Sequence, residues 1–276
     1  MNYRHLYHAG NFADVVKHAV LALCLDHLRA KPAPFRVIDT HAGRGRYDLA
    51  GVEAGKTLEW TDGIGRLAGV DAAPLPEAIA EILAPYLAVI HAENPAQLSI
   101  YPGSPALARA MLRGQDRLVV NELHPADHAA LSTQFARDAQ VKVLALDGWT
   151  ALKALLPPKE RRGLVLIDPP FERRDDFNSL ARSLREAAGR FATGVFILWH
   201  PIKDGALAAA FYEAARRAGF EKTLRVEFRV HAKRAGLGAC GLFIVNPPWT
   251  LRAKLEILGP FLAERLAQGE AYFRID

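Results

Sequence analysis

The tetrapeptide Asp168-Pro169-Pro170-Phe171 carries the clearest chemical signal in the 276-residue sequence. Proline has a fixed φ angle and no backbone N–H, so two prolines keep this loop rigid and leave its carbonyl oxygens free. A planar heterocycle with an exocyclic amine fits such a loop, because its ring can stack on Phe171 while the Asp168 carboxylate and the Pro169 carbonyl accept two N–H bonds. These bonds draw the nitrogen lone pair out of ring conjugation, toward an incoming methyl group. We therefore predict that Asp168, Pro169 and Phe171 are catalytic.

A glycine-rich turn, residues 39–45 (Asp-Thr-His-Ala-Gly-Arg-Gly), follows an earlier apolar run. Its glycines lack side chains, so backbone amides there can approach a ligand closely. A tight strand-to-helix turn that only needs positive φ angles would have the same sequence. The turn alone is therefore a weak indication of a nucleotide site.

Carboxylates end four of five short apolar runs in the sequence. The four are Asp39, Glu122, Asp147 and Asp168. In an open α/β sheet a ligand lies across the carboxyl ends of the strands, so these side chains should line one crevice. Glu122 has the character of an acid that binds ribose hydroxyls, and a position beside a helix start at His124-Pro125 is the alternative. Asp147-Gly148 could bind an adenine amino group or simply form a turn.

The five apolar runs alternate with helical patterns, which predicts βαβ units and a mostly parallel sheet. The runs are residues 35–39, 117–122, 141–147, 163–168 and 194–199. Residues 222–230 and 240–246 alternate like an antiparallel pair, so the sheet should be mixed. A helix is expected at residues 13–30, where Lys31-Pro32 ends it.

The spacing of the glycines and Glu122 indicates an insertion. A ribose-binding acid usually follows the glycines by about 20 residues, whereas Glu122 follows Gly45 by 122 − 45 = 77. Residues 50–97 have helical patterning at 75–92 and several turn glycines. We predict an N-terminal segment with the first strand at 1–49, an inserted helical subdomain at 50–97, and the remainder of the main domain at 98–276.

Composition narrows the class of protein further. Half of the residues are hydrophobic, the net charge is +5 and the pI is near 9.3, which is a globular composition with a tilt toward polyanionic partners. Cys24 and Cys240 are the two cysteines, so a disulfide framework and a thiolate zinc site are excluded and no metal is expected. No apolar run approaches the roughly 18 residues of a spanning helix, so we expect a cytoplasmic protein without membrane contact.

Several motifs carry a family resemblance. A D-P-P-[FYW] tetrapeptide after a glycine turn is similar to that of amino-group DNA and RNA methyltransferases that use S-adenosylmethionine. Within that class the chain resembles the ribosomal RNA large subunit methyltransferase J family, which methylates an adenine N6 of 23S rRNA. The supporting segments are residues 3–5, 8–11, 14–18, 39–43, 101–105, 122–125 and 246–249. The resemblance covers nearly the whole chain and is weakest at residues 50–97 and after Trp249.

The resemblance implies a Rossmann-like class I methyltransferase fold with a mixed seven-stranded sheet, S-adenosylmethionine as cofactor and 23S rRNA as partner. Asp168 would be the catalytic acceptor, and Tyr3 with Arg4 would contact the RNA. The expected cofactor-binding residues are Lys17, His18, Asp39, His41, Gly43, Ser104, Glu122, Asp147, Gly148 and Asp168. We expect a monomer.

Physical interpretations accompany several of these assignments. Ser104-Pro105 has the pattern of an N-cap followed by the first helical residue, which would turn a helix N-terminus toward the methionine carboxylate, and Lys17 would add a positive charge. The alternatives are a purely structural cap at Ser104 and a solvated helix charge at Lys17. His18 and His41 could each be satisfied polar residues at the sheet edge.

Competing functions remain open from the sequence. Asn246-Pro247-Pro248-Trp249 has the same form as the first tetrapeptide and is the alternative catalytic site. A DNA adenine methyltransferase would use the same tetrapeptide, and a non-catalytic RNA-binding α/β protein would share the basic charge. A C5-pyrimidine methyltransferase would need a nucleophilic cysteine, which neither Cys24 nor Cys240 resembles.

Overall fold

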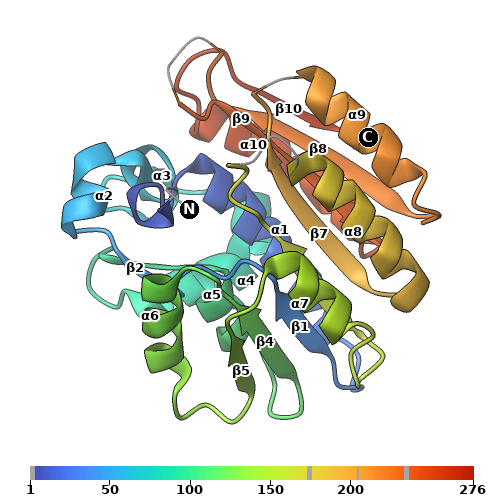
Figure 1. Ribbon diagram of the computed structural model, residues 1–276. Helices are drawn as coiled ribbons and strands as arrows, with labels where there is room; N and C mark the ends of the chain where they lie inside the picture. The colour runs from blue at the N-terminus through green and yellow to red at the C-terminus, as the bar shows by residue number, and fades with distance from the viewer. Residues whose placement is uncertain (1–3, 173–175, 204, 233–235) are drawn as a thin grey trace.

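The computed structural model describes residues 4–172, 176–203, 205–232 and 236–276. Its centre is a mixed sheet with helices on both faces (Figure 1). One part of this sheet is parallel, in the order β5-β4-β1-β6-β7. These strands are β5 (Val141–Leu144), β4 (Arg117–Asn121), β1 (Arg36–Asp39), β6 (Gly163–Ile167) and β7 (Val195–Pro201). Each of the five apolar runs therefore forms a strand, as predicted.

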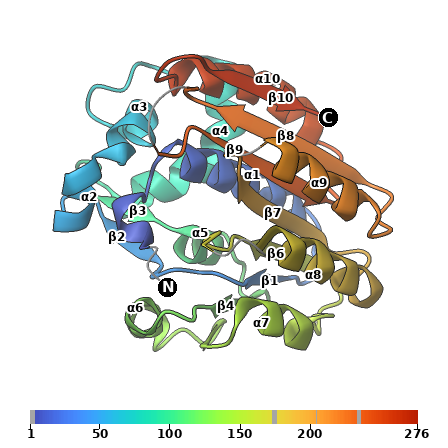
Figure 2. The same ribbon diagram turned by 45° about the horizontal axis from the view of Figure 1, so that its top comes forward.

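The other part of the sheet is antiparallel. Strand β9 (Ala239–Val245) lies between β7 and β8 (Thr223–Arg229), and β10 (Tyr272–Ile275) pairs with β8. The mixed sheet is confirmed, but seven strands is wrong, because the described residues form eight in this sheet. An uncovered edge strand exposes unpaired N–H and C=O groups, and β10 covers that edge of β8. Figure 2 shows β10 beside β8 after the last helix, α10 (Leu251–Arg265).

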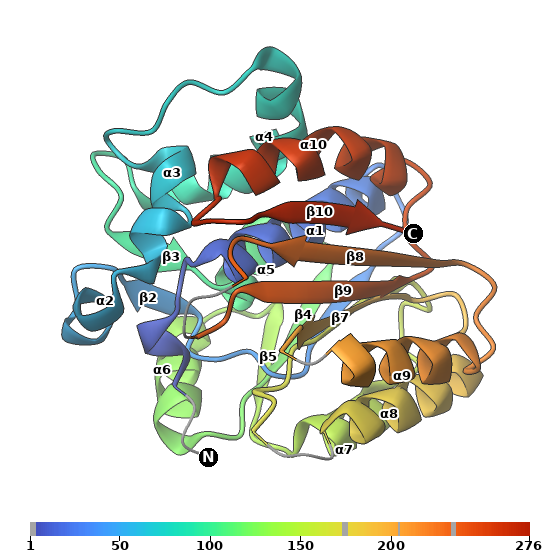
Figure 3. The same ribbon diagram turned by 90° about the horizontal axis from the view of Figure 1, so that it is seen from above.

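Two helical layers cover the sheet (Figure 3). One layer contains α1 (Phe12–Arg29), α4 (Glu77–Glu93), α5 (Ser104–Ala110) and α10; the other contains α7 (Gly148–Leu155), α8 (Asp176–Arg190) and α9 (Gly205–Arg216). Successive side chains of a strand point to opposite faces. In β6, Leu164 packs in the core shared with α1, and Val165 packs in the core shared with α8. Helix α6 (Pro125–Phe135) packs beside β5.

Helix α1 is buried along most of its length, polar residues included. It begins after Asn11, whose side-chain oxygen accepts hydrogen bonds from the amides of Ala13 and Asp14 at 3.0 and 3.1 Å. The 3-10 turn η1 (His5–Tyr7) precedes it. Because α1 is covered by the sheet and by neighbouring helices, its polar residues must find partners inside the protein.

The expected inserted segment begins and ends near a small separate sheet. Strands β2 (Arg46–Asp48) and β3 (Ile100–Pro102) pair antiparallel. Between them lie α2 (Val52–Thr57), η2 (Glu59–Asp62), α3 (Gly65–Ala68) and α4. Helix α4 packs on α1, and its apolar face belongs to the same core as α1. The domain boundaries at residues 50 and 97 stay a prediction.

Because α4 shares the core of α1, we expect a cavity in α4 to destabilise the whole protein. Leu83 is 1% exposed, and its replacement in Leu83→Ala should lower the free energy of unfolding by about 2–5 kcal/mol. Urea unfolding followed by circular dichroism measures this. Glu81→Ala, at an exposed position of the same helix, is the matched control and should change stability by less than about 0.5 kcal/mol. A second, separate unfolding transition in Leu83→Ala would contradict a shared core.

Candidate active site

A cavity of about 940 Å³ opens at the carboxyl ends of the parallel strands. After β1 the chain continues to β4 and β5 on one side, and it later returns to β6 on the other side of β1. Such a reversal of strand order leaves a crevice between the loops that follow β1 and β6. The glycine-rich turn and the Asp168 tetrapeptide follow these two strands, so the fold brings them together.

Most predicted site residues line this cavity. They are Lys17, His18, His41, Gly43, Ser104, Glu122, Asp147, Gly148, Asp168, Pro169 and Phe171. Asp39 does not; it is 1% exposed and lies beneath the cavity wall. Arg4 also lies outside the lining set, and Tyr3 lies outside the described residues. The roles of these residues remain predictions.

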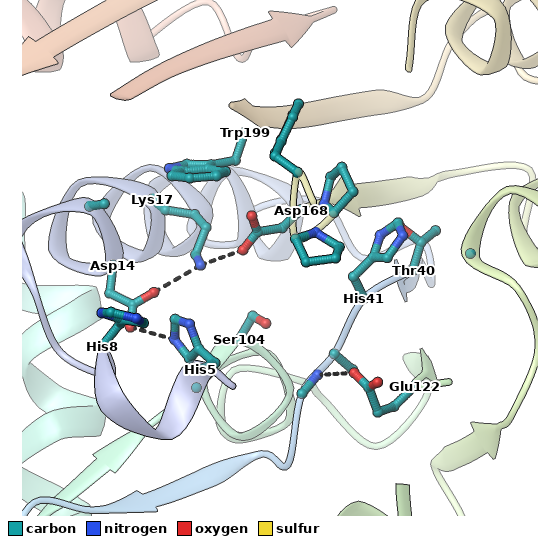
Figure 4. A pocket seen from close by; sticks show the side chains of 18 of the residues that line it. His5, His8, Asp14, Lys17, Thr40, His41, Ser104, Glu122, Asp168 and Trp199 are labelled. Atoms are coloured by element: carbon teal, nitrogen blue, oxygen red, sulfur yellow. Dashed lines mark hydrogen bonds and ion pairs between the residues drawn. The ribbon is translucent and has the colours of Figure 1, made fainter. Parts of the chain in front are cut away.

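Lys17 connects the tetrapeptide to the N-terminal segment. Its Nζ lies 2.6 Å from Asp168 Oδ2 and 2.8 Å from Asp14 Oδ1. Asp14 Oδ2 in turn lies 2.9 Å from His5 Nε2 and accepts a hydrogen bond from the Gly10 amide. Figure 4 shows Lys17 between the two carboxylates, with a dashed line joining Asp14 to His5. Residues from η1, α1 and the loop after β6 therefore form one charged network.

Charge pairing keeps Lys17 and Asp14 ionised despite their burial. Burial alone would lower the pKa of Lys17, but the charges of Asp14 and Asp168 outweigh it and hold that pKa well above its ordinary value. Burial would raise the pKa of Asp14, but the charges of His5 and Lys17 hold it well below its ordinary value. Lys17 is only 4% exposed, so the interpretation as a solvated helix charge is wrong.

Phe171 presents an aromatic surface to the cavity. Its backbone is left-handed, with φ of 49°, which costs a residue with a Cβ about 1–2 kcal/mol. The Phe171 ring packs at 4.9 Å from Phe177 and edge-on at 5.8 Å from Trp199. Strain of this kind persists only where surrounding contacts enforce it, and here the aromatic neighbours supply those contacts.

Glu122 supports the glycine-rich turn directly. One carboxylate oxygen accepts a hydrogen bond from the Gly43 amide at 2.8 Å and the other accepts one from the His124 amide at 2.7 Å. Burial raises the pKa of this carboxyl. Each carboxylate oxygen has a second lone pair, so these backbone bonds leave capacity for ligand hydroxyls. The structural and the ribose-binding interpretations of Glu122 are therefore compatible.

His41 and Gly148 pack against each other at one side of the cavity. A Cβ on Gly148 would lie 2.3 Å from His41 Nε2, so only glycine fits there. The His41 ring is edge-on to Trp149 at 5.5 Å. Asp147 caps α7, because its Oδ1 accepts hydrogen bonds from the amides of Trp149 and Thr150. This part of the cavity combines a flat aromatic surface with a carboxylate at a helix start.

Ser104, which lines the cavity, pairs with Asp39 beneath it. Ser104 Oγ donates to Asp39 Oδ2 at 2.6 Å, and burial raises the pKa of Asp39 to about 7. The expected N-cap position is wrong by one residue: α5 begins at Ser104 itself, after Gly103, without a side-chain cap bond. The Ser104 hydroxyl donates to the buried carboxylate instead of capping the helix.

The second tetrapeptide lies at the opposite end of the strands. Because β9 runs antiparallel to β7, the residues after β9 lie far from the carboxyl ends of the parallel strands. Asn246 Nδ2 donates to the carbonyls of Ala192 and Gly194 at 2.7 and 2.8 Å. Neither Asn246 nor the other residues of the tetrapeptide line the cavity. Its contacts indicate that Asn246 ties a loop in place.

Several residues around the cavity were not predicted as site residues, among them His8, Asp14, Glu59 and Trp199. Glu59 Oε1 lies 2.9 Å from His8 Nδ1, and Glu59 Oε2 accepts a hydrogen bond from Asn11 Nδ2 at 3.0 Å, which joins η2 to the N-terminal segment. The spacing of Asp14 and Lys17 on one helix face was an available signal. The position of Trp199 near the carboxyl end of β7 was another.

The strand order, the glycine-rich turn and the Asp168 tetrapeptide together define a Rossmann-like class I methyltransferase. A family model described as "Ribosomal RNA large subunit methyltransferase D, RlmJ" matches residues 32–276, and the chain belongs to this family.

Two relatives and one solved structure are similar to this chain over nearly its whole length. The chain is 41% identical over 270 residues to ribosomal RNA large subunit methyltransferase J of Haemophilus influenzae, covering 96% of this chain and 94% of the relative. It is 40% identical over 268 residues to the Escherichia coli protein of the same name, with the same two coverages. A crystal structure of a Legionella pneumophila protein superposes with a TM-score of 0.88 at 35% identity and covers 98% of both chains.

Two absences hold for the part of the chain that the structure describes. None of the helices in that part is both long enough and apolar enough to cross a membrane. Within the same residues, no group of three or more His, Cys, Asp or Glu side chains is arranged to hold a metal ion.

Buried neutral histidines make stability depend on pH. Burial lowers the pKa of His18 to about 3, of His41 to about 4 and of His200 to about 4. The unfolded chain, with histidine pKa values near 6.5, binds more protons below that pH, so stability should fall as pH falls from 6.5 toward 4. Three groups act in the opposite direction: Asp39, whose pKa burial raises to about 7, Glu122, whose pKa burial also raises, and His8, whose pKa is raised by its hydrogen bond to Glu59.

We therefore expect the free energy of unfolding to fall by about 2 kcal/mol between pH 6.5 and pH 5. Urea unfolding of the ligand-free protein at both pH values measures this. His200→Gln, which removes one of the three neutral histidines, should reduce the difference between the two pH values. An unfolding midpoint that does not change with pH would contradict the buried neutral histidines.

Proposed function

We propose that this chain transfers a methyl group from S-adenosylmethionine to the exocyclic N6 amine of an adenine in 23S rRNA. The observation that carries the proposal is the Asp168 tetrapeptide, which lies at the reversal of strand order and lines the large cavity. The chain belongs to a family that is described as a ribosomal RNA large subunit methyltransferase, and this supports ribosomal RNA as the substrate. The names of the two bacterial relatives support it as well.

The cavity residues fit the parts of S-adenosylmethionine. Glu122 would bind the ribose hydroxyls through its remaining lone pairs, and Asp147 with Trp149 would flank the adenine. His18, whose Nε2 is buried without a hydrogen-bond partner among the described residues, would contact the amino-acid end. When bound, this cofactor supplies an electrophilic methyl group on a sulfonium.

The chain's own residues would prepare the target amine. The base stacks on Phe171, while Asp168 and the Pro169 carbonyl accept its two N–H bonds. The nitrogen lone pair would then point toward the electrophilic methyl group that the bound cofactor would supply, and Asp168 would accept the proton that the amine loses and pass it to water. Lys17 donates to Asp168 Oδ2, which fixes the direction of the carboxylate.

An adenine in a stem must leave its stack to reach Phe171, at a cost of about a few kcal/mol. Cations of the N-terminal segment and of α2 would hold the phosphates of the flanking RNA. Arg4 of the N-terminal segment and Lys56 on α2 are our candidates. Helix α2 packs against η1, and Figure 1 shows it near the N-terminal end of the chain.

Methyl transfer to separated nucleic acids tests the proposal. Tritiated S-adenosylmethionine should label large-subunit rRNA from cells that lack the enzyme, and nucleoside analysis should identify N6-methyladenosine. Genomic DNA from the same cells is the control and should stay unlabelled. Label confined to DNA would favour the DNA adenine methyltransferase, and cofactor binding without transfer to any polymer would favour a non-catalytic protein.

Replacing Asp168 tests the reaction centre. Asp168→Asn keeps the side-chain shape but removes the negative charge and turns an NH₂ group toward the substrate amine. We expect kcat to fall by about 100-fold or more, with the cofactor Kd changed little, because the lost interaction acts mainly in the transition state. Asn246→Ala is the comparison, and kcat should stay within about threefold of wild type when values are taken from folded protein. The reverse pattern would move the catalytic site to the second tetrapeptide.

A further inference from the structure

Three buried side chains, two tyrosines and one histidine, form consecutive hydrogen bonds from α4 to the cavity. Tyr86 Oη on α4 lies 3.1 Å from Tyr101 Oη on β3, and Tyr101 Oη lies 2.6 Å from His18 Nδ1 on α1. All three side chains are at most 1% exposed. The Tyr101 and His18 rings are also stacked, with centroids 5.5 Å apart. The three residues therefore have little freedom to change partners.

The direction of these hydrogen bonds follows from whether each hydroxyl proton has an acceptor. If Tyr86 donates to Tyr101 and Tyr101 donates to His18, both hydroxyl protons are used and only oxygen lone pairs remain. If the bonds ran the other way, His18 would donate to Tyr101 and Tyr101 would donate to Tyr86. The hydroxyl proton of Tyr86 would then be buried in the core, where the described residues offer it no second partner. A buried unpaired donor is costly, and a phenol is a better donor to imidazole nitrogen than the reverse. His18 Nδ1 is therefore the acceptor.

This direction determines the other nitrogen of His18. Burial lowers the pKa of His18 to about 3, so the ring is neutral near pH 7. A neutral imidazole that accepts at Nδ1 carries its proton at Nε2. His18 lines the cavity, and its Nε2 is buried with no hydrogen-bond partner among the described residues. A donor of this kind needs an acceptor that the described protein atoms do not provide.

We propose that Tyr86 and Tyr101 are positioning residues that hold His18 as the neutral Nε2–H tautomer, which donates to the carboxylate of the cofactor's amino-acid moiety. This inference rests on the proposed function. The ammonium group of that moiety cannot accept a hydrogen bond, whereas the carboxylate is its strongest acceptor. Lys17 is already paired with two carboxylates, and His18, the next residue along α1, is a neutral donor that can bind the ligand carboxylate.

The inference gives the inserted segment a role in cofactor binding. Tyr86 belongs to residues 50–97, for which the sequence pattern predicts a separate subdomain. Through Tyr101, α4 would influence cofactor binding without touching the cofactor. A change in α4 would then alter affinity for one chemical group of the ligand rather than for the whole ligand.

Calorimetry with two ligands separates these effects. S-adenosylmethionine carries the carboxylate, and decarboxylated S-adenosylmethionine lacks only that group. Tyr101→Phe should weaken binding of the first by about three- to tenfold, the effect of one ordinary hydrogen bond, and should change binding of the second by less than about twofold. Tyr86→Phe should act in the same direction with a smaller effect.

Tyr212→Phe is the matched control, because Tyr212 Oη also bonds to a buried histidine, His200 Nε2, at 2.8 Å, away from the cavity lining. It should leave both affinities unchanged. Long-range ¹H–¹⁵N NMR spectra, with His18 assigned from His18→Ala, report the tautomer directly. They should show a proton on Nε2 in wild type and a mixture of tautomers in Tyr101→Phe.

Each other result overturns the inference. Equal weakening of both ligands in Tyr101→Phe would show a merely structural role. An unchanged preference for the carboxylate would show that His18 Nε2–H binds water or another ligand group. A wild-type proton on Nδ1 would reverse the direction of the bonds. Failure of wild type to bind S-adenosylmethionine would instead refute the proposed function, and with it the carboxylate as the partner of His18.

Discussion

One buried charge, the ammonium of Lys17 between Asp14 and Asp168, holds the parts of the site together. A charge removed from water costs several kcal/mol unless partners of opposite sign surround it, and loss of one partner leaves the rest uncompensated. The loop after β6 must therefore lie against α1, and η1 must approach Asp14 through His5. The position of the tetrapeptide is thereby coupled to the N-terminal segment.

The same constraint explains why the N-terminal segment is part of the site. His8 and Asn11 both contact Glu59 of η2, while Asn11 also caps α1. One short segment thus connects the inserted residues, the buried helix and the charged network. A disturbance at any of these contacts would reach Asp168 through Lys17, because each group satisfies the next.

Two kinds of polar group line the cavity. Around Lys17 the groups are charged and paired, whereas His18 and His41 are kept neutral by burial. Neutral donors next to paired charges can recognise a zwitterionic ligand without adding a net charge to the site. This division fits the proposed cofactor, whose amino-acid end carries both signs.

Local patterns were enough to predict the five parallel strands, the helix at 13–30 and the position of the Asp168 tetrapeptide at a strand end. Apolar periodicity, proline and glycine determine the conformation of the backbone close to them, so the sequence records these features. The alternation near residues 222–246 also indicated the mixed sheet. Long-range packing was needed to turn Asp39 inward to Ser104, to make Asn246 tie a loop, and to add β10 as an eighth strand within the described residues. These outcomes depend on partners far away in the chain, such as the 65 positions between Asp39 and Ser104, which no local pattern records.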